Sequence, residues 1–158
     1  MPKRGVTMAR VLDVAQYILE QQGGSMTTMK LQKLVYYSQA WNLVWDGVPL
    51  YSSPIQAWAN GPVVPELYNR HRGRFTVSAT EPLGDSSALA QSEKETIDAV
   101  LSAYSHLSGQ QLSDITHGER PWIEARAGIP EGAASQAVVN PEVMQDYFGG
   151  KHGEQLRA

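Results

Sequence analysis

The sequence predicts a mainly α-helical fold, and three observations support that prediction. Apolar residues recur every three or four positions in several segments, which is the spacing of one face of a helix. Residues that can cap a helix stand before most of these segments, and glycines stand after several of them. Apolar segments that could form β-strands are short, and the clearest of them is Ile55–Ala59. We therefore expect a compact domain of six to seven helices with a minor β element or extended segment near Ile55–Ala59.

Two long helices are predicted at the start of the chain. The first runs from about Met8 to Gln22 and stops at Gly23, which favours the backbone angles of a helix end. The second is capped by Thr27 or Thr28 and extends to about Trp45. Its apolar residues, which include Trp41 and Trp45, are expected in the core.

The next segment is predicted to be less regular. After a turn at Asp46-Gly47, Ile55–Ala59 is interpreted as a short buried strand or extended segment. Pro65 fits the first turn of a third helix that ends near Arg72. Phe75–Val77 is the predicted partner strand of the Ile55 run.

The second half of the chain is predicted to contain four further helices. The first has a capping box, in which Ser92 caps the helix and Glu95 reaches back to it. Two short helices follow, at Gln110–His117 and from Pro121 onward. Asn140 and the proline after it open a last helix that ends near Phe148.

The length of 158 residues favours one domain. We place this domain at residues 1–148, and we expect residues 149–158, which are polar and rich in glycine, to form a flexible tail.

Composition excludes several classes of protein. The chain has no cysteine, so disulfides and thiolate metal sites are excluded, which fits a reducing cytoplasm. No apolar run approaches the ~20 residues of a membrane span, so no membrane partner is expected. The net charge of −3 makes nucleic acid an improbable partner.

Few residues point to catalysis. The four histidines do not form a known ligand spacing, and no Gly-rich phosphate loop is present, so no metal and no cofactor are predicted. His117, with Glu119 two residues on, is the one candidate base, and the alternative is that His117 completes a helix end. We predict no catalytic residues and no enzyme activity.

One basic cluster stands out. Arg70, Arg72 and Arg74 could bind phosphate groups, or they could be a solvated helix end in which arginine complements the helix dipole.

Aromatic residues concentrate between Met29 and Tyr68, which contain three of the four tryptophans and four of the seven tyrosines. Lys30, Lys33 and Tyr37 fall on one helical face, where they either cover the edge of the core or form a recognition surface. Trp58 stands beside a turn, where an exposed strand edge could meet a partner.

Four motifs occur in order along the chain: KLQKLVYYSQAW from Lys30, PLY from Pro49, IQAWANGPVVPELY from Ile55 and LSDITHGERPW from Leu112. Together they resemble the Panacea domain, the SocA-like or GepA-type family of phage and prophage proteins. The resemblance covers about Val11 to Phe148. It implies a small helical domain without enzyme activity that acts as an antitoxin and binds a cognate protein toxin.

The resemblance implies two ways of acting on the toxin. Direct binding would neutralise it, and the alternative, typical of the SocA type, is delivery of the toxin to a AAA+ protease. A further alternative from the residues alone is a small enzyme that uses His117 and Glu119. The predicted partner-binding residues are Lys30, Gln32, Lys33, Tyr36, Tyr37, Trp58, Asn60, Tyr68, His117 and Trp122.

Overall fold

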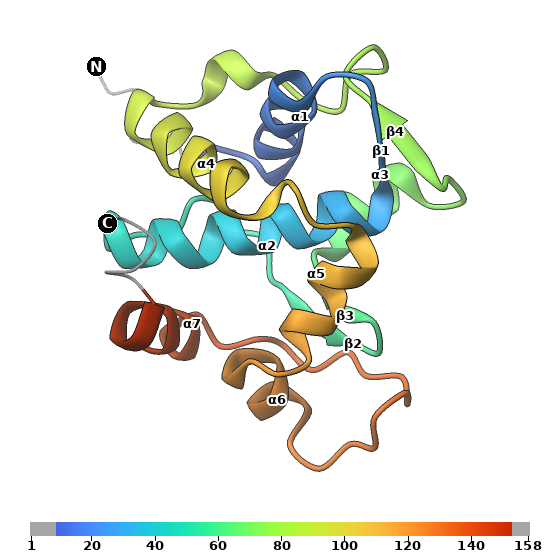
Figure 1. Ribbon diagram of the computed structural model, residues 1–158, viewed down its shortest axis with the longest axis vertical. Coiled ribbons are helices and arrows are strands. Elements are labelled where there is room, and N and C mark those ends of the chain that lie inside the picture. The colour runs from blue at the N-terminus through green and yellow to red at the C-terminus, as the bar shows by residue number, and fades with distance from the viewer. Residues whose placement is uncertain (1–8, 153–158) are drawn as a thin grey trace.

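A central helix organises the structure, a computed structural model that describes residues 9–152. This helix, α2 (Thr28–Trp45), crosses the middle of the molecule with helices on both sides (Figure 1). Its residues 31–43 are all buried. A helix covered on every side does not need one apolar stripe, because each of its faces contacts another part of the protein.

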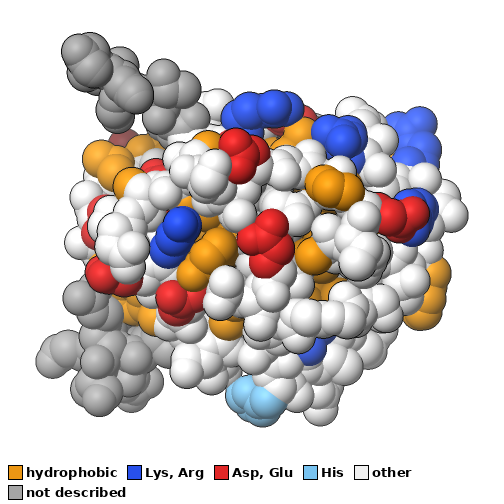
Figure 2. Space-filling view, turned by 90° about the horizontal axis from the view of Figure 1, so that it is seen from above, with side chains coloured by type: hydrophobic (Ala, Val, Ile, Leu, Met, Phe, Trp, Pro, Cys, Tyr) orange, Lys and Arg blue, Asp and Glu red, His pale blue; other side chains and the backbone are white. Residues whose placement is uncertain are grey.

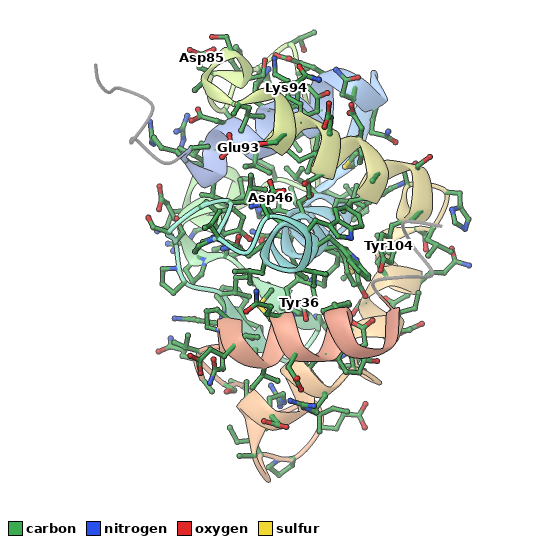
Figure 3. The ribbon with its side chains drawn as sticks, turned by 90° about the vertical axis from the view of Figure 1, so that its left-hand side faces the viewer. Tyr36, Asp46, Asp85, Glu93, Lys94 and Tyr104 are labelled. Atoms are coloured by element: carbon green, nitrogen blue, oxygen red, sulfur yellow. The ribbon has the colours of Figure 1, made fainter. Side chains whose placement is uncertain are left out.

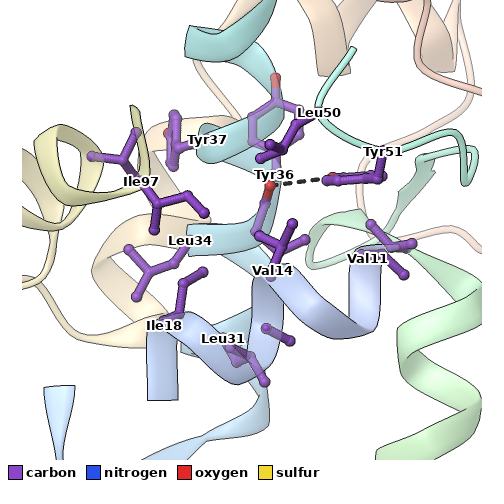
Figure 4. Close-up of a cluster of buried hydrophobic side chains, with 14 of the residues drawn as sticks. Val11, Val14, Ile18, Leu31, Leu34, Tyr36, Tyr37, Leu50, Tyr51 and Ile97 are labelled. Carbon is purple, nitrogen blue, oxygen red and sulfur yellow. Dashed lines mark hydrogen bonds between the residues drawn. The ribbon is translucent and has the colours of Figure 1, made fainter. Parts of the chain in front are cut away.

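Two helices cover one side of α2. They are α1 (Val11–Gln22) and α4 (Gln91–Tyr104), and both pack directly on α2. Figure 4 shows the apolar layer between them, in which Ile18 of α1, Leu34 of α2 and Ile97 of α4 lie close together. All three side chains are completely buried.

The C-terminal helix α7 (Pro141–Tyr147) covers the opposite side of α2. In the view along α2, Tyr36 lies between the two helices (Figure 3). The Tyr36 ring meets Phe148 edge to face, with 6.3 Å between the ring centroids. Aromatic pairs of this geometry add to the stability that burial alone provides.

The remaining elements are short. The helices among them are α3 (Pro65–His71), α5 (Gly109–Thr116), α6 (Arg120–Arg126), the 3-10 turn η2 (Ser86–Ala88) and the helical turn η3 (Phe148–His152). With seven α-helices and only short strands in residues 9–152, the predicted mainly α fold is confirmed.

The strand pairing differs from the prediction. Strand β2 (Gln56–Trp58) pairs with β3 (Gly61–Val63), and not with the Phe75 segment. Strand β4 (Thr76–Ser78) instead pairs with β1 (Ser25–Thr27), which was not predicted as a strand. The β2–β3 hairpin closes over two residues, whereas the predicted pairing had to close a much longer loop at a greater entropic cost.

The capping box of α4 was also predicted at the wrong residues. The helix starts at Gln91, and the Glu93 carboxylate, not that of Glu95, accepts the backbone N–H of the cap residue Ala90 at 2.7 Å. The preceding residue Leu89 is buried, and its packing fits a helix that is capped two residues before Ser92.

The start of α1 also differs, since the helix begins at Val11 and not near Met8. The starts of α2 and α7 agree with the sequence. Thr27 caps α2 by accepting the backbone N–H of Lys30 at 3.1 Å, and Asn140 caps α7 through the N–H of Glu142. Trp41 is buried in the core, as predicted, and Trp45 packs against it.

Polar residues of α2 fasten the chain that wraps around it. The Gln39 side chain accepts the N–H of Leu50 at 2.6 Å and donates to the carbonyl of Tyr51 at 2.8 Å. The Asn42 amide donates to the carbonyl of Val48 at 2.9 Å. These bonds satisfy buried polar groups and hold the long connection between α2 and β2 in place.

The surface over α1 and α4 carries mixed charges. Figure 2 shows acidic and basic side chains alternating there with single apolar ones. Such a face produces no strong field of one sign.

Candidate functional site

The β2–β3 turn is held from behind by α5 and α6. Four consecutive backbone carbonyls, those of residues 57–60, each accept a hydrogen bond from a side chain of these helices. The donors, in order, are Arg126 to Ala57, Trp122 to Trp58, His117 to Ala59 and Ser113 to Asn60. The fourth sequence motif, which contains three of these donors, therefore positions the third motif.

The bond from His117 defines the state of its ring. Its Nε2 lies 2.9 Å from the Ala59 carbonyl oxygen, which can only accept, so Nε2 carries a proton. The ring also stands edge-on to Trp122, with 4.2 Å between centroids. His117 thus supports the turn from the side of α5.

Gly61 allows strand β3 to pack closely against α2 and α5. Its φ is +113°, and a Cβ at this position would lie 2.6 Å from Cε of Lys33 and 2.9 Å from the Thr116 hydroxyl. Only glycine fits here, because both the backbone angle and the available space exclude a side chain.

A pocket of about 470 Å³ opens beside this turn. It lies between the start of α2, the β2–β3 turn, α3 and the loop that precedes α7. Its lining residues are Thr28, Met29, Gln32, Lys33, Trp58, Ala59, Asn60, Val63, Tyr68, His71, Ala134, Ser135 and Gln136. Five of the predicted partner-binding residues are thereby brought together: Gln32, Lys33, Trp58, Asn60 and Tyr68.

Lys33 supplies the positive charge of the pocket. Its side chain is 2% exposed, yet within residues 9–152 its ammonium group makes no hydrogen bond and no ion pair. Burial lowers the pKa of Lys33 to about 8, because the charged form loses its hydration. The lining contains no Asp or Glu among the described residues.

Gln32 and His71 form a neutral pair next to Lys33. The Gln32 side-chain oxygen accepts the N–H of Val64 at 2.9 Å, which fixes the orientation of the amide. Its NH₂ group must then donate to Nε2 of His71, also at 2.9 Å, so this nitrogen is unprotonated. Desolvation, together with the nearby Lys33 charge, lowers the pKa of His71 and favours this neutral ring.

Aromatic rings form the wall of the pocket. Trp58 and Tyr68 meet edge to face, with 5.0 Å between centroids, and both are partly exposed. The guanidinium of Arg72 lies 5.5 Å from the centre of the Tyr68 ring. Partly exposed rings beside a charged floor combine apolar contact with orientation, as binding pockets commonly do.

Five predicted residues lie outside the pocket lining. Two of them, His117 and Trp122, hold the β2–β3 turn from behind. Tyr36 and Tyr37 are completely buried in the core, and the Tyr37 hydroxyl donates to the Glu119 carboxylate at 3.0 Å. Lys30 donates to the carbonyl of Ser105 at 2.6 Å and so ties α2 to the end of α4. Because their side chains are used within the fold, these residues contribute to the pocket only through the helix that they stabilise.

His117 and Glu119, the two residues that the enzyme alternative would use, contact different parts of the protein. His117 donates to the β2–β3 turn, whereas the Glu119 carboxylate is buried against Tyr37. Burial raises the pKa of Glu119 to about 8, which keeps much of the carboxyl protonated near neutral pH. In the part of the chain that the structure describes, no cluster of three or more His, Asp or Glu residues could hold a metal ion.

The basic cluster after α3 is partly neutralised. Arg74 forms an ion pair with Glu81, and Arg72 donates to Asn69 at 3.0 Å. Both arginines are exposed, so these contacts fix their positions at little energetic gain.

Sequence reasoning missed two classes of residue. The first class, Ser113 and Arg126, holds the turn. The only sequence signal for these residues was their position as polar residues of short helices within or next to a recognised motif. The second class completes the pocket, namely His71 and the loop 134–136, which approaches the start of α2 only after folding.

The fold and the pocket together define a helical domain whose surface carries a pocket with a cationic floor and an aromatic wall. The sequence pattern of one family, antitoxin SocA-like, Panacea domain, matches residues 31–123, more than half of the chain. The protein belongs to this family, which supports a role of the antitoxin type. No curated protein and no solved structure matches the chain.

Membership implies a protein partner such as a toxin and suggests a role without catalysis. Within residues 9–152, no helix is both long and apolar enough to cross a membrane.

Proposed function

We propose that this protein is an antitoxin that binds a cognate protein toxin in the cytoplasm and neutralises it by direct contact. The observation that carries the proposal is the family match over residues 31–123, which covers most of the central helix, the β2–β3 turn, α5 and the first half of α6. Eight of the thirteen residues that line the pocket, including Trp58 and Tyr68, lie within this region.

The contact surface is centred on the pocket. Trp58 and Tyr68 are partly exposed, and Asn60 at the tip of the turn is exposed. Tryptophan and tyrosine dominate the binding energy of many interfaces, especially where a rigid backbone presents them. Here the backbone is rigid because four side chains hold the turn. Toxin bound over this surface would be blocked sterically, without chemistry.

A co-expression experiment tests the proposal. The reading frame next to the gene is expressed alone and then with this protein, growth is measured, and a tagged copy is used for co-purification. We expect the neighbouring gene to be toxic when it is expressed alone. Co-expression with this protein should restore growth, and the two proteins should purify as a stable complex. A toxic neighbour that neither binds nor is rescued would refute the proposal.

The lifetime of the toxin separates neutralisation from delivery to a AAA+ protease. Direct binding predicts an unchanged toxin half-life during rescue, measured after protein synthesis is stopped. A half-life that shortens only when this protein is present would replace direct neutralisation with proteolytic delivery.

A blocking variant locates the surface. Gln136→Trp places a bulky side chain at the exposed edge of the pocket, and Gln21→Trp makes the same change at the exposed end of α1. The first variant is expected to abolish rescue and the second to retain it, with both remaining folded. Equal rescue by the two variants would place the contact elsewhere.

A further inference from the structure

We infer that the pocket beside the β2–β3 turn binds a side-chain carboxylate, an aspartate or glutamate of the protein partner, which pairs with the ammonium group of Lys33. This inference rests on the proposed function for the source of the carboxylate. The existence of an anion-binding pocket does not depend on it.

The first step is the missing counter-charge. Lys33 lines the pocket at 2% exposure, and no described residue provides a hydrogen bond or an ion pair to its ammonium group. Buried charges in proteins are normally paired, because an isolated one is costly. Arg126 shows how this chain satisfies a buried cation elsewhere, with three backbone carbonyls around one guanidinium.

The second step is the fixed position of the Lys33 side chain. Cε and Nζ lie against Gly61, where a Cβ would come within 2.6 Å and 3.4 Å of them. Neighbouring atoms thus enclose most of the side chain, in agreement with its 2% exposure. A group positioned in this way does not spend conformational entropy when a ligand pairs with it.

The third step is the charge around the pocket. Gln32 and His71 are locked in a neutral hydrogen-bonded pair, and no described carboxylate lines the cavity. Lys33 is thus the one charge that faces the ligand among the described lining residues. A single ammonium matches a monoanion, whereas phosphate groups are commonly bound by several cations or by helix N-termini. The start of α2 borders the pocket, but the backbone N–H groups of Thr28 and Lys30 there already donate to Phe75 and Thr27.

The fourth step selects a side chain over a chain terminus. The wall consists of the Trp58 and Tyr68 rings, with Met29 and Val63 beside them. The methylene groups of a glutamate would contact these rings, and its carboxylate would reach Lys33. A C-terminal residue would instead bring its own amide group into a mostly apolar wall, where polar groups need partners.

The experiment uses three small probes on the full chain. N-acetylglutamate N-methylamide presents a side-chain carboxylate, N-acetylglutamine N-methylamide is its neutral isostere, and N-acetylleucine presents a terminal carboxylate. Binding is followed by NMR at the indole N–H of Trp58 and at the ¹³Cε signal of Lys33 during a pH titration.

The glutamate probe is expected to bind in the millimolar range, about tenfold or more tightly than the glutamine probe. It should also shift the titration midpoint of Lys33 upward by about one pH unit, since an opposite charge favours the ammonium form. Equal binding of the two probes, or no binding, overturns the inference. Tighter binding of N-acetylleucine overturns the assignment to a side chain.

Two variants provide the control. Lys33→Met removes the ammonium and keeps the length of the side chain, and Lys30→Met removes the same charge from the same helix outside the pocket. Lys33→Met should lose the preference for the glutamate probe, while Lys30→Met keeps it. An unchanged preference in folded Lys33→Met refutes the role of Lys33.

The partner test keeps the two proposals apart. Rescue of the toxin by the wild-type protein tests the proposed function, whatever Lys33 does. With a bound toxin, one Asp→Asn or Glu→Gln substitution in it should lower affinity for the wild type and have no effect with Lys33→Met. Independent effects of the two substitutions at every acidic position would refute the pairing.

Discussion

At the scale of single residues, Lys33 is a site where stability and binding oppose each other. Its charged form is buried without a partner, which destabilises the folded protein. We expect Lys33→Met to raise the free energy of unfolding at pH 7 by about 3 kcal/mol, in line with a pKa lowered from 10.5 to about 8. Chemical denaturation monitored by circular dichroism measures this change.

The control for this prediction is Lys30→Met, which loses one hydrogen bond to Ser105 and should be slightly destabilised. If Lys33→Met were destabilised by a similar amount, Lys33 would have an internal partner, and the argument for an unpaired charge would be wrong. A stabilised variant that has lost partner binding is what a functional residue predicts.

Gly61 gives a second prediction at this scale. In Gly61→Ala, the new Cβ would clash with Lys33 and Thr116 at a φ of +113°. We expect a loss of about 3 kcal/mol or more, from the sum of backbone strain and overpacking. Urea denaturation with a fixed m-value measures it.

Gly47→Ala is the matched control for backbone strain alone. Gly47 also has a positive φ, +74°, but a Cβ there would meet nothing within 4 Å. Its loss should be about 1–2 kcal/mol. Equal losses at the two glycines would mean that the contact between Gly61 and Lys33 relaxes without cost.

At the scale of elements, the β2–β3 hairpin depends on donors from α5 and α6. Trp122→Phe removes the N–H that donates to the Trp58 carbonyl at 2.9 Å and keeps most of the ring. We expect a stability loss of about 1 kcal/mol and faster amide hydrogen exchange within β2 and β3. Mass spectrometry of exchanged peptides resolves this region.

Trp41→Phe tests whether the effect is local. It removes a comparable hydrogen bond, from Trp41 to the Tyr104 hydroxyl at 3.2 Å, at the contact of α2 with α4. Its exchange should increase around α4 and not in the hairpin. A hairpin that exchanges equally fast in both variants would show that global stability, and not the Trp122 bond, holds the turn.

The helices could be predicted because their signals are local. Capping by Thr27 and Asn140, and the stop at Gly23, act within one turn of the chain and were placed correctly. The start of α4 was placed too late because two similar capping patterns overlap there. The burial of Leu89, which depends on tertiary packing, decided between them.

The strand partners could not be predicted, because pairing is a long-range property. Three-residue strands such as β1 and β4 carry too few side chains to reveal their register. β1 also follows Gly23-Gly24 directly, and a pair of glycines is typical of a helix end followed by a loop. Its pairing with β4 becomes evident only when α3 returns the chain to the start of α2.

The sequence predicted partner-binding residues but no pocket, and only some of these residues line it. Lys33, Trp58 and Tyr68 belong to motifs whose aromatic content indicated recognition, and they do line one cavity. Tyr36 and Tyr37 belong to the same motif but face the core, since successive helical positions point in different directions. Without the phase of α2 in the fold, the sequence could not separate the two groups.

At the scale of the whole molecule, the buried ionisable groups differ in the number of hydrogen-bond partners that the protein gives them. Asp13 accepts two backbone N–H groups, and Arg126 donates to three carbonyls. Glu119 has the Tyr37 hydroxyl, and Lys33 has no described partner. The last two therefore dominate the pH dependence of stability, with opposite signs.

The folded state keeps the Glu119 proton between pH 4.5 and about 8, where the unfolded state has lost it, so stability falls as pH rises through this range. The unfolded state keeps the Lys33 proton between about 8 and 10.5, where the folded state has lost it, so stability rises there. His71, with a lowered pKa, partly offsets the fall below its ordinary value of 6.5.

Stability should therefore pass through a minimum near pH 8. Above pH 10 the buried tyrosines, whose pKa values are raised by desolvation, make stability fall again. Urea denaturation at half-unit steps from pH 6 to 10 measures the profile, with an expected depth of a few kcal/mol.

Two variants test which residue causes the fall in stability below pH 8 and which causes the rise above it. Glu119→Gln should remove the fall before pH 8 and leave the rise, whereas Lys33→Met should remove the rise and leave the fall. Glu131→Gln, in an exposed loop, should change neither arm. A minimum that persists in both single variants would mean that other groups set it. Loss of the rise in Lys33→Met would establish that this ammonium titrates near pH 8, as expected of a buried lysine that has no partner within residues 9–152 and lines an open pocket.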